Sequence, residues 1–263
     1  MTEQTEWRRL SFDARADEYR LARPPYPDRV YQVLTERCGL GPGTRLLEVG
    51  PGTGQATREL LARGADVIAV EPGARLADHL VADLPGASLR VIREGIETAA
   101  LFDSTFDLVV SATAFHWVKP DVTLPKLARA LRPGGWLAVW WTDFGDRERP
   151  TEFRAGLDEL YGRYLPNERR YAVPARGPLN VESWRAELSQ GGHFGWPEVE
   201  LIRWEHALTA DRARRLFGSF PNVNELGPST RAELLDAIGV LVLRLGGVVQ
   251  DPYVTVLYLT QPL

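Results

Sequence analysis

The chain has 263 residues, of which 44% are hydrophobic and 25% charged, an ordinary globular composition with room for one large α/β domain. Its net charge of -4 gives no electrostatic case for nucleic acid, and Cys38, the single cysteine, excludes an internal disulfide and a cysteine cluster for zinc. The start lacks the apolar core of a signal peptide, and AIGVLVL, the most apolar stretch, is too short to cross a bilayer, so we expect a soluble cytoplasmic protein.

The first forty residues are predicted to form a helical lid. Residues 12–23 have the period of an amphipathic helix, which stops at RPPYP because proline disfavours the helical conformation of the residue before it. Residues 28–40 resume the helical period and end at a Gly-Pro-Gly turn. We therefore treat residues 1–40 as an N-terminal helical lid.

Apolar strands alternate with helices from residue 41 to residue 144. The strands are predicted at residues 45–49, 66–71, 88–93, 106–112 and 136–141, and the helices at residues 54–64, 73–84 and 123–131. Such alternation, with continuous apolar strands, indicates a parallel sheet that is covered by helices on both faces. Right-handed crossovers then make the sheet doubly wound.

The alternation breaks after Thr142. Helical pieces follow at residues 151–165, 181–190, 211–220 and 231–245, and further strands at residues 198–208 and 251–260. We therefore predict an α/β fold with a doubly wound, mostly parallel, seven-stranded sheet that is Rossmann-like and carries helical cap insertions. Residues 41–144 form its ligand-binding core, residues 145–197 a cap insertion for substrate, and residues 198–263 the last strands with a second helical insertion.

The segment EVGPGTGQ, residues 48–55, is a glycine-rich turn between a strand and a helix. Ligands of open α/β sheets bind outside the carboxyl ends of the strands, which is where this turn lies. A phosphate-binding Walker loop requires a closing Gly-Lys-Ser/Thr, which this turn lacks. A dinucleotide fingerprint requires a glycine at position 55, where this chain has Gln55. The spacing G-x-G-x-G therefore disfavours a pyrophosphate, and a dinucleotide oxidoreductase is the weaker alternative.

Two carboxylates flank this turn. Glu48 precedes the glycines and would repel a phosphate, whereas it could accept hydrogen bonds from an ammonium group. Glu71 ends the second strand, 17 positions after Gly54, where an acidic side chain can accept both ribose hydroxyls. Glycines let the backbone approach a ligand without a Cβ collision. S-adenosylmethionine has an ammonium, a sulfonium and a ribose but no phosphate, and it fits this pattern.

The motifs EVGPGTG, VEP and RPGG, in this order, resemble those of class I S-adenosylmethionine-dependent methyltransferases over roughly residues 10–142. FDARADEYRLARPPYP and SATAFHWV are similar to segments of the small-molecule branch that includes the trans-aconitate methyltransferase-like proteins. The resemblance implies the Rossmann-like methyltransferase fold and S-adenosyl-L-methionine as cofactor. It also implies methyl transfer to a small-molecule acceptor, and we favour oxygen as the acceptor atom.

The resemblance also implies the residues that contact the cofactor. Glu71 would hold the ribose, Pro72 would pack near the adenine, and the family's aspartate for the adenine amino group falls on Gly95. Either Glu97, the backbone or packing on Ile96 would then hold the adenine. The methionine moiety and the sulfonium would be lined by Glu48, Gly50, Pro51, Gly52, Thr53, Gly54, Ser111, Ala112 and Thr113.

The predicted lid offers Tyr19 and Arg23, which lie four positions apart and so on one helix face. The functional interpretation is a lid that closes on the methionine carboxylate, with which a guanidinium pairs well. The structural alternative is a packed tyrosine beside a solvated arginine.

His116 follows the fourth strand, at the edge where a methyl acceptor would lie. A neutral imidazole there could take the acceptor's proton as a catalytic base, or it could be hydrogen-bonded within its loop. A phenol or an alcohol needs such a base, whereas a carboxylate does not. Trp117, Trp141 and Phe144 are the further candidates for substrate contacts.

The alternative function is a cyclase of the same fold in secondary metabolism, which binds the cofactor without methyl transfer. The acidic balance and the lack of a basic stripe argue against a nucleic-acid methyltransferase, so we expect a small-molecule acceptor and neither a nucleic-acid nor a membrane partner. The chain could be a monomer or a homodimer. No metal is expected, because metal-ligand spacing is absent among His79, His193 and His206.

Overall fold

The computed structural model describes residues 22–166 and 177–263. The predicted helix at residues 12–23, with Tyr19, therefore lies almost wholly outside the described residues. The first half of the described chain consists of α3 (Asp28–Cys38), β1 (Arg45–Val49), α4 (Gln55–Ala62), β2 (Asp66–Val70), α5 (Ala74–Asp83), β3 (Leu89–Ile92), β4 (Phe106–Ala112), the short 3-10 helix η1 (Phe115–Trp117) and α6 (Pro120–Ala130).

The second half begins with a long strand and adds most of the helices outside the core. Its elements are β5 (Leu131–Phe144), α7 (Glu152–Tyr164), α8 (Val181–Ser189), the 3-10 helix η2 (Gln190–Gly192), β6 (Glu198–Thr209), α9 (Ala210–Gly218), α10 (Pro221–Asn224), α11 (Pro228–Arg244) and β7 (Val248–Thr260). The predicted elements of residues 28–164 and 181–260 are all present, whereas α10 and both 3-10 helices were not predicted.

The strands form one seven-stranded sheet in the order β3-β2-β1-β4-β5-β7-β6. The pairs among β1 to β5 are parallel, and β7 runs antiparallel between β5 and β6. The predicted doubly wound, mostly parallel sheet is therefore confirmed. Because the chain moves outward from β1 to β3 and then returns to place β4 on the other side of β1, a ligand crevice is expected at the carboxyl ends of β1 and β4.

Helices cover both faces of the sheet because neighbouring residues of a strand point to opposite sides. On β1, Leu47 contributes to the core beneath α6 and α8, and Leu46 contributes to the core beneath α3 and α4. Both leucines are completely buried. A strand that is apolar on both faces is therefore what this layered arrangement requires.

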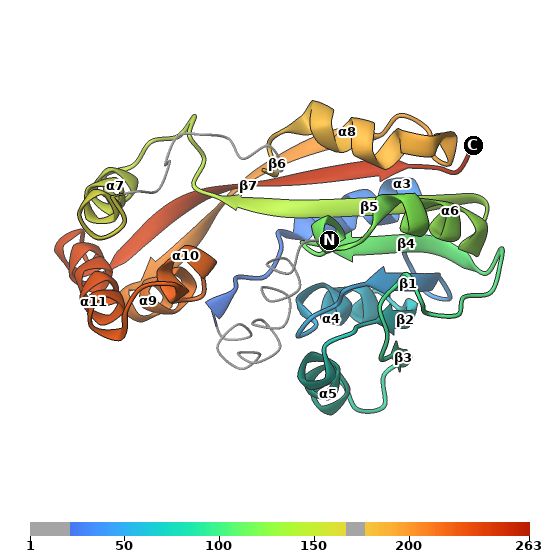
Figure 1. Cartoon of the computed structure of the whole chain (residues 1–263), viewed down its shortest axis with the longest axis horizontal. Coiled ribbons are helices and arrows are strands. Elements are labelled where there is room, and N and C mark those ends of the chain that lie inside the picture. The colour runs from blue at the N-terminus through green and yellow to red at the C-terminus, as the bar shows by residue number, and fades with distance from the viewer. Residues whose placement is uncertain (1–21, 167–176) are drawn as a thin grey trace.

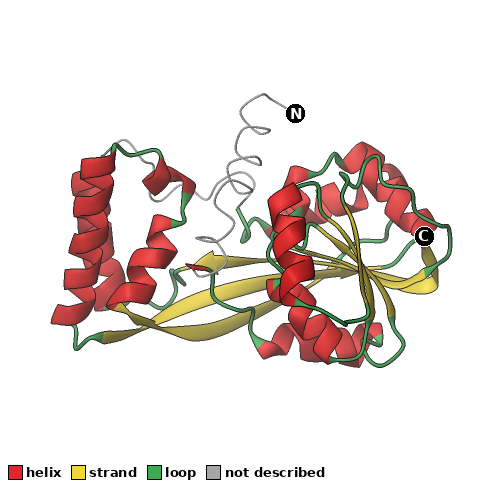
Figure 2. Cartoon of the chain, turned by 90° about the horizontal axis from the view of Figure 1, so that it is seen from below, coloured by secondary structure: helices red, strands yellow, loops and turns green. Residues whose placement is uncertain are grey.

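The last strands extend beyond the core and carry a separate group of helices (Figure 1). The pairing of β5 ends at Phe144, opposite Tyr253, while β6 and β7 continue as a two-stranded ribbon. Helices α7, α9, α10 and α11 gather at this end, and Figure 2 shows them apart from the helices that cover the sheet. Phe153, Phe217 and Ile238 are buried in the centre of this group.

The range 145–197, predicted as one cap insertion, is divided between two places. Helix α7 belongs to the group of helices at the end of the ribbon (α7, α9, α10 and α11), which we call the distal helical group. Helix α8 instead packs on the sheet face beside α6. Trp184 of α8 stacks on Trp141 of β5, with ring centroids 4.0 Å apart. The apolar side of α8 is therefore used to cover the sheet, and α8 is not part of the distal group.

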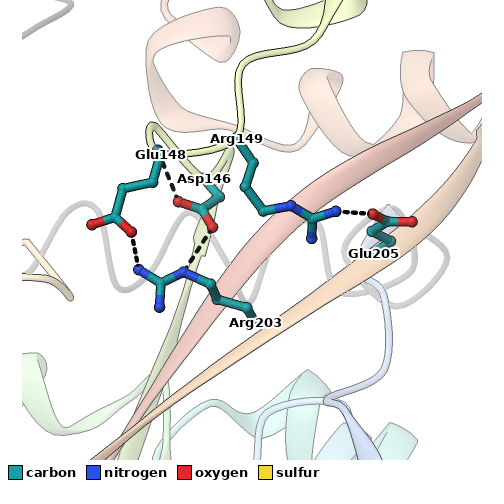
Figure 3. A network of polar contacts seen from close by, with 5 residues as sticks. All are labelled: Asp146, Glu148, Arg149, Arg203 and Glu205. Carbon is teal, nitrogen blue, oxygen red and sulfur yellow. Dashed lines mark hydrogen bonds and ion pairs between the residues drawn. The ribbon is translucent and has the colours of Figure 1, made fainter.

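Polar contacts join the loop that follows β5 to strand β6, at the point where the ribbon leaves the core (Figure 3). The Asp146 carboxylate is almost fully buried and accepts hydrogen bonds from Arg203 Nε (3.1 Å) and from the backbone N–H of Glu148 (3.0 Å). Arg203 also pairs with the Glu148 carboxylate, and Arg149 pairs with Glu205. This network holds the loop after β5 against β6.

Candidate functional site

A cavity of about 1410 Å³, counted with its open mouth, lies at the carboxyl ends of β1, β2 and β4. This is the position expected from the strand order. Most of the predicted site residues line it: Arg23, Gly50, Pro51, Gly52, Glu71, Pro72, Gly95, Ile96, Glu97, Ala112, Thr113, Trp117 and Phe144. Residues from distant parts of the sequence thus meet in one hollow.

The other predicted site residues that the structure describes do not line the cavity. Glu48, Thr53 and Ser111 are completely buried, because their side chains lie beneath the strand ends and the glycine turn. Ser111 donates a hydrogen bond to the carbonyl of Val49 (3.0 Å) and so joins β4 to β1. The other described site residues that do not line the cavity are Gly54, His116 and Trp141.

The three glycines of the turn differ in what surrounds them. All three have positive φ angles, 69° at Gly50, 57° at Gly52 and 83° at Gly54, a conformation that glycine adopts at little cost. A Cβ on Gly50 would lie 2.5 Å from the Cβ of Ala114, and one on Gly54 would lie 2.5 Å from Leu80. A Cβ on Gly52 would meet nothing within 4 Å. Gly52 therefore leaves open space in which a ligand could lie.

Glu71 joins the glycine turn to the end of β2. One carboxylate oxygen accepts a hydrogen bond from the backbone N–H of Gly52 (3.0 Å), and the other accepts one from Gly73 (2.8 Å). The side chain lines the cavity although only 5% of the residue is exposed. A carboxylate can accept about four hydrogen bonds. Glu71 is therefore both a brace of the turn and a candidate acceptor for hydroxyl groups of a ligand.

Glu48 has a different environment from the one that we predicted. Its Oε2 accepts a hydrogen bond from the Thr57 hydroxyl (2.7 Å), and its Oε1 is buried without a hydrogen-bond partner among the described residues. Burial raises the pKa of the Glu48 carboxyl to about 7, and the nearby Glu71 charge acts in the same direction while the Thr57 hydrogen bond opposes it. Direct contact between Glu48 and a bound ammonium stays a prediction.

The raised pKa of Glu48 makes the stability of the protein pH-dependent. The folded chain keeps this proton up to about pH 7, whereas an exposed carboxyl in the unfolded chain loses it near its ordinary pKa of 4.5. The Glu48 contribution to the free energy of unfolding is therefore largest below the unfolded pKa and falls as the pH rises to about 7. Between pH 4 and pH 8 this decline in the free energy of unfolding is about 3 kcal/mol, and we expect Glu48→Gln to remove it.

Urea denaturation of both proteins at several pH values measures this effect. Glu59→Gln is the control, because this acid lies on the outer part of α4 and pairs with Arg63. If the free energy of unfolding changed with pH in the same way in the wild type and in Glu48→Gln, the Glu48 carboxyl of the folded chain would have its ordinary pKa.

The end of β4 is held in an uncommon backbone conformation. Thr113 has a φ of 57°, which a β-branched residue rarely adopts and which is often found at functional sites. Its N–H donates to the carbonyl of Trp140 (2.8 Å), and its hydroxyl shares a hydrogen bond with the Tyr26 hydroxyl (2.8 Å). Tyr26 also packs edge-on against Trp140. The strained residue thus contacts the predicted lid, residues 1–40, through Tyr26.

Sequence reasoning missed several lining residues, among them Tyr26, Gln55 and Thr142. Gln55 was used only as evidence against a dinucleotide. Its Oε1 accepts a hydrogen bond from the Thr53 hydroxyl (2.9 Å), and its Nε2 is buried without a hydrogen-bond partner among the described residues. Buried donors normally have partners, so this amide group is a candidate ligand contact. Its position directly after the third glycine was the signal that could have identified it.

Arg23 lies where the core meets the distal helices. Its guanidinium is stacked over the rings of Phe144 and Phe220, with centroid distances of 5.2 and 4.8 Å. A guanidinium on an aromatic face can still donate hydrogen bonds in its own plane. Arg23 is the only lining residue with a cationic side chain in the part of the chain that the structure describes.

His116 lies behind the cavity wall. Its Nδ1 accepts a hydrogen bond from the Trp141 indole N–H (3.2 Å), and its ring lies 4.4 Å from that of Trp117. A neutral imidazole that accepts through Nδ1 carries its proton on Nε2. To take up a further proton, His116 would have to give up the hydrogen bond from Trp141, which is itself buried against Trp184. The role of His116 as a catalytic base stays a prediction.

No group of three or more histidine, cysteine, aspartate or glutamate side chains in residues 22–166 and 177–263 is arranged to hold a metal ion. Over the same residues, none of the helices combines the length and the apolar character needed to span a membrane.

Comparisons with known proteins agree with this architecture. Residues 47–139 match the family model of a methyltransferase domain. An uncharacterized methyltransferase of Mycobacterium tuberculosis is 37% identical over 154 residues, which cover 59% of this chain. The chain thus spans 60% of the length of that curated relative.

Solved structures share the fold. A putative type II methyltransferase from Anaeromyxobacter dehalogenans has a TM-score of 0.67 at 20% identity, and the match covers 90% of this chain and 97% of that one. Phosphoethanolamine N-methyltransferase 2 of Haemonchus contortus, solved with phosphomonomethylethanolamine and S-adenosylhomocysteine, has a TM-score of 0.56 at 15% identity over 95% of this chain and 58% of that one. The sheet with its covering helices is therefore an α/β methyltransferase fold.

Proposed function

We propose that this chain is a class I methyltransferase that uses S-adenosyl-L-methionine, as the methyltransferase-domain match and the shared fold support. The observation that carries the proposal is the open space at Gly52, whose N–H donates to the Glu71 carboxylate at the same wall of the cavity. Of the described lining residues, only Arg23 has a cationic side chain, and the Gly52 N–H of the turn is already bonded to the Glu71 carboxylate. The cavity thus favours a nucleoside without phosphates.

The residues present fit this cofactor in three respects. Gly52 supplies a surface without a side chain, Glu71 supplies a carboxylate for the ribose hydroxyls, and the buried Gln55 amide offers an unused hydrogen-bonding group. Arg23 would pair with the methionine carboxylate, together with Tyr19 if the predicted lid closes. Glu48 would act from beneath the turn, since it does not line the cavity.

The cofactor supplies a methyl group that its sulfonium already activates, so the tasks of the chain are orientation and exclusion of water. Ala112 and Thr113 at the end of β4 would lie beside the sulfonium, and Trp117 and Phe144 would form the wall of the acceptor pocket. We favour a small-molecule acceptor with an oxygen nucleophile. The hydroxyls of Thr113 and Tyr26, which are hydrogen-bonded to each other, could orient such an oxygen.

Calorimetry with S-adenosylhomocysteine and with NAD tests the cofactor. We expect S-adenosylhomocysteine to bind. NAD is expected to give no measurable heat of binding, because the turn has Gln55 in place of the third glycine of a dinucleotide fingerprint. Tight binding of NAD would overturn the proposal. Incubation with cell extract and methyl-labelled cofactor tests the reaction, since a cyclase of this fold would transfer no label.

His116→Ala tests how the residue contributes to turnover. We expect unchanged affinity for S-adenosylhomocysteine, because the side chain does not line the cavity. We also expect slower label transfer, by about 10-fold or more, because the change removes either a base or the support of Trp117. Trp196→Ala, a change at an exposed aromatic residue outside the cavity, is the control. A loss of cofactor affinity in His116→Ala would assign the residue to the donor side or to the fold.

A further inference from the structure

Helix α11 carries the most apolar stretch of the chain, AIGVLVL at residues 237–243, which has apolar residues on every side of the helix. Ile238 and Val242 point into the core of the distal helical group and are completely buried, whereas Val240 and Leu243 are 43% and 59% exposed. A helix that is apolar on all sides is typical of one that is buried on all sides. In the part of the chain that the structure describes, only one side of this stretch is covered.

The exposed apolar side chains of the described residues are concentrated at this helix. Nine large hydrophobic side chains are exposed there, and three of them, Val240, Leu243 and Val248, lie within residues 240–248. Val240 and Leu243 share one face of α11 because they are three positions apart, and Val248 begins β7 after a short turn. Figure 1 shows α11 at the end of the distal helical group, away from the parallel strands. Exposed apolar side chains that are grouped, unlike single ones, indicate an interaction site.

Two opposite charges flank the apolar residues on the outer side of α11. Asp236 lies four positions before Val240 and Arg244 four positions after it, so the three side chains lie along one side of the helix. The Asp236 side chain is 77% exposed, and its carboxylate lies 3.6 Å from Arg214 Nε. Arg244 is exposed, and no ion pair joins it to any residue that the structure describes. We call Asp236, Val240, Leu243 and Arg244 the α11 face.

The order of its charges makes the α11 face complementary to itself. When two copies of a helix pack antiparallel about a twofold axis at Val240, Asp236 of one copy lies opposite Arg244 of the other, and symmetry forms the same pair a second time. Leu243 lies three positions after Val240 and so faces Ala237 of the other copy. The steps from Asp236 to Val240 and on to Leu243, four positions and then three, are those of a seam between packed helices. Such a pair buries the apolar residues between two ion pairs.

We propose that the α11 face is a homodimer interface, in which the α11 helices of two copies pack antiparallel about Val240. Burial of the exposed valine and leucine side chains supplies the driving force, and the two ion pairs fix the register of the helices. A single helix pair buries an area at the low end of specific interfaces, so the dimer forms at high protein concentration and dissociates on dilution. The assembly requires neither a cofactor nor methyl transfer.

A membrane surface fits the α11 face less well than a second copy does. Helices that lie on membranes are rich in lysine and arginine on their polar side. Helix α11 has two basic residues, Arg231 and Arg244, and Arg231 already donates to the carbonyl of Gly218 (3.1 Å). The exposed carboxylate of Asp236 would be repelled by anionic lipids. A second copy uses both the acid and the base of the face.

Sedimentation velocity of the full chain across a concentration series tests the proposal. We expect the sedimentation coefficient of the wild type to rise with concentration from that of a monomer to that of a dimer. Leu243→Glu is expected to weaken self-association by about 10-fold or more, because it places an unpaired carboxylate in the apolar part of the interface. Leu201→Glu, which changes an exposed leucine of β6, is the matched control and is expected to associate like the wild type.

Charge reversal tests the antiparallel register. Asp236→Arg brings two arginines together at each ion pair, and Arg244→Asp brings two aspartates together. Each variant alone is therefore expected to associate about 10-fold or more weakly than the wild type. An equimolar mixture of the two variants is expected to recover the association, because a mixed dimer pairs every arginine with an aspartate. Recovery in the mixture also shows that both variants fold.

A wild type that remained monomeric across the series would refute the homodimer. A dimer that Leu243→Glu did not weaken would have its interface on another surface. If Leu243→Glu weakened the dimer but the mixture of charge variants failed to associate, the antiparallel arrangement about Val240 would be wrong. Flotation of a monomeric wild type with phosphatidylserine vesicles, together with loss of flotation in Leu243→Glu, would assign the α11 face to a membrane surface instead.

Discussion

Replacement of Gly50 by alanine is expected to lower the free energy of unfolding by about 2–5 kcal/mol. A φ of 69° costs an alanine about 1–2 kcal/mol, because its Cβ approaches the neighbouring carbonyl oxygen in this conformation. The new Cβ would also lie 2.5 Å from the Cβ of Ala114, and overpacking of this kind costs about 1–3 kcal/mol more. Urea denaturation monitored by tryptophan fluorescence measures the loss.

Gly52→Ala is the matched variant. Its φ is also positive, at 57°, but its Cβ would point into open space, so only the backbone cost of about 1–2 kcal/mol applies. We expect this protein to fold and to bind S-adenosylhomocysteine at least 10-fold more weakly, because the methyl group occupies the ligand's space. Equal destabilisation by the two changes would contradict the contact between the turn and Ala114. Unchanged affinity in Gly52→Ala would show that the ligand lies elsewhere.

Glu71→Ala is expected to weaken the binding of S-adenosylhomocysteine by about 1–3 kcal/mol, which is the usual scale for hydrogen bonds to a charged group. The carboxylate would be lost to the ribose hydroxyls, and the N–H groups of Gly52 and Gly73 would lose their acceptor. Both effects act on the part of the cavity where the cofactor, the methyl donor, is proposed to bind. Calorimetry measures the affinity, and thermal unfolding without ligand measures how much the turn itself is weakened.

Two variants make the Glu71 result interpretable. Glu71→Gln keeps one oxygen for a backbone N–H and removes the charge, so an intermediate loss of affinity is expected. Glu233→Ala removes an exposed acid from α11, in the distal helical group, and is expected to leave the affinity unchanged. Unchanged affinity in Glu71→Ala would mean that the ribose does not lie at the end of β2.

The distal helices reach the cavity through few residues. Phe144 ends β5 and contacts Phe220, which lies between α9 and α10, with ring centroids 5.5 Å apart. Arg23 stacks over both rings. The glycine turn and Glu71 belong to the core, whereas the wall around Phe144 depends on helices carried by the β6–β7 ribbon. Changes in the distal helices could therefore alter the proposed acceptor pocket and the position of Arg23 without altering the glycine turn and Glu71.

The sequence alone determined the order and type of the core elements, because these depend on local patterns. The strands β1 and β4 coincide with the predicted ranges 45–49 and 106–112, since short apolar runs bounded by turn residues can be recognised without knowledge of their partners. The glycine turn and Glu71 were found in the same way. Their meeting in one cavity follows from the rule that the carboxyl ends of parallel strands share an edge.

Only the tertiary structure decided which side chains reach the cavity, because this depends on contacts between residues far apart in the sequence. The contact between Glu48 and the ligand stays a prediction, and only the structure shows that this carboxylate is buried and accepts a hydrogen bond from Thr57. Helix α8 has an apolar side that fits a cap or a sheet face equally well, and the match between Trp184 and Trp141 selects the face. The hydrogen bonds from the Lys126 ammonium on α6 to the carbonyls of Ile96 and Glu97 span about thirty positions of sequence, and no local pattern could have indicated them.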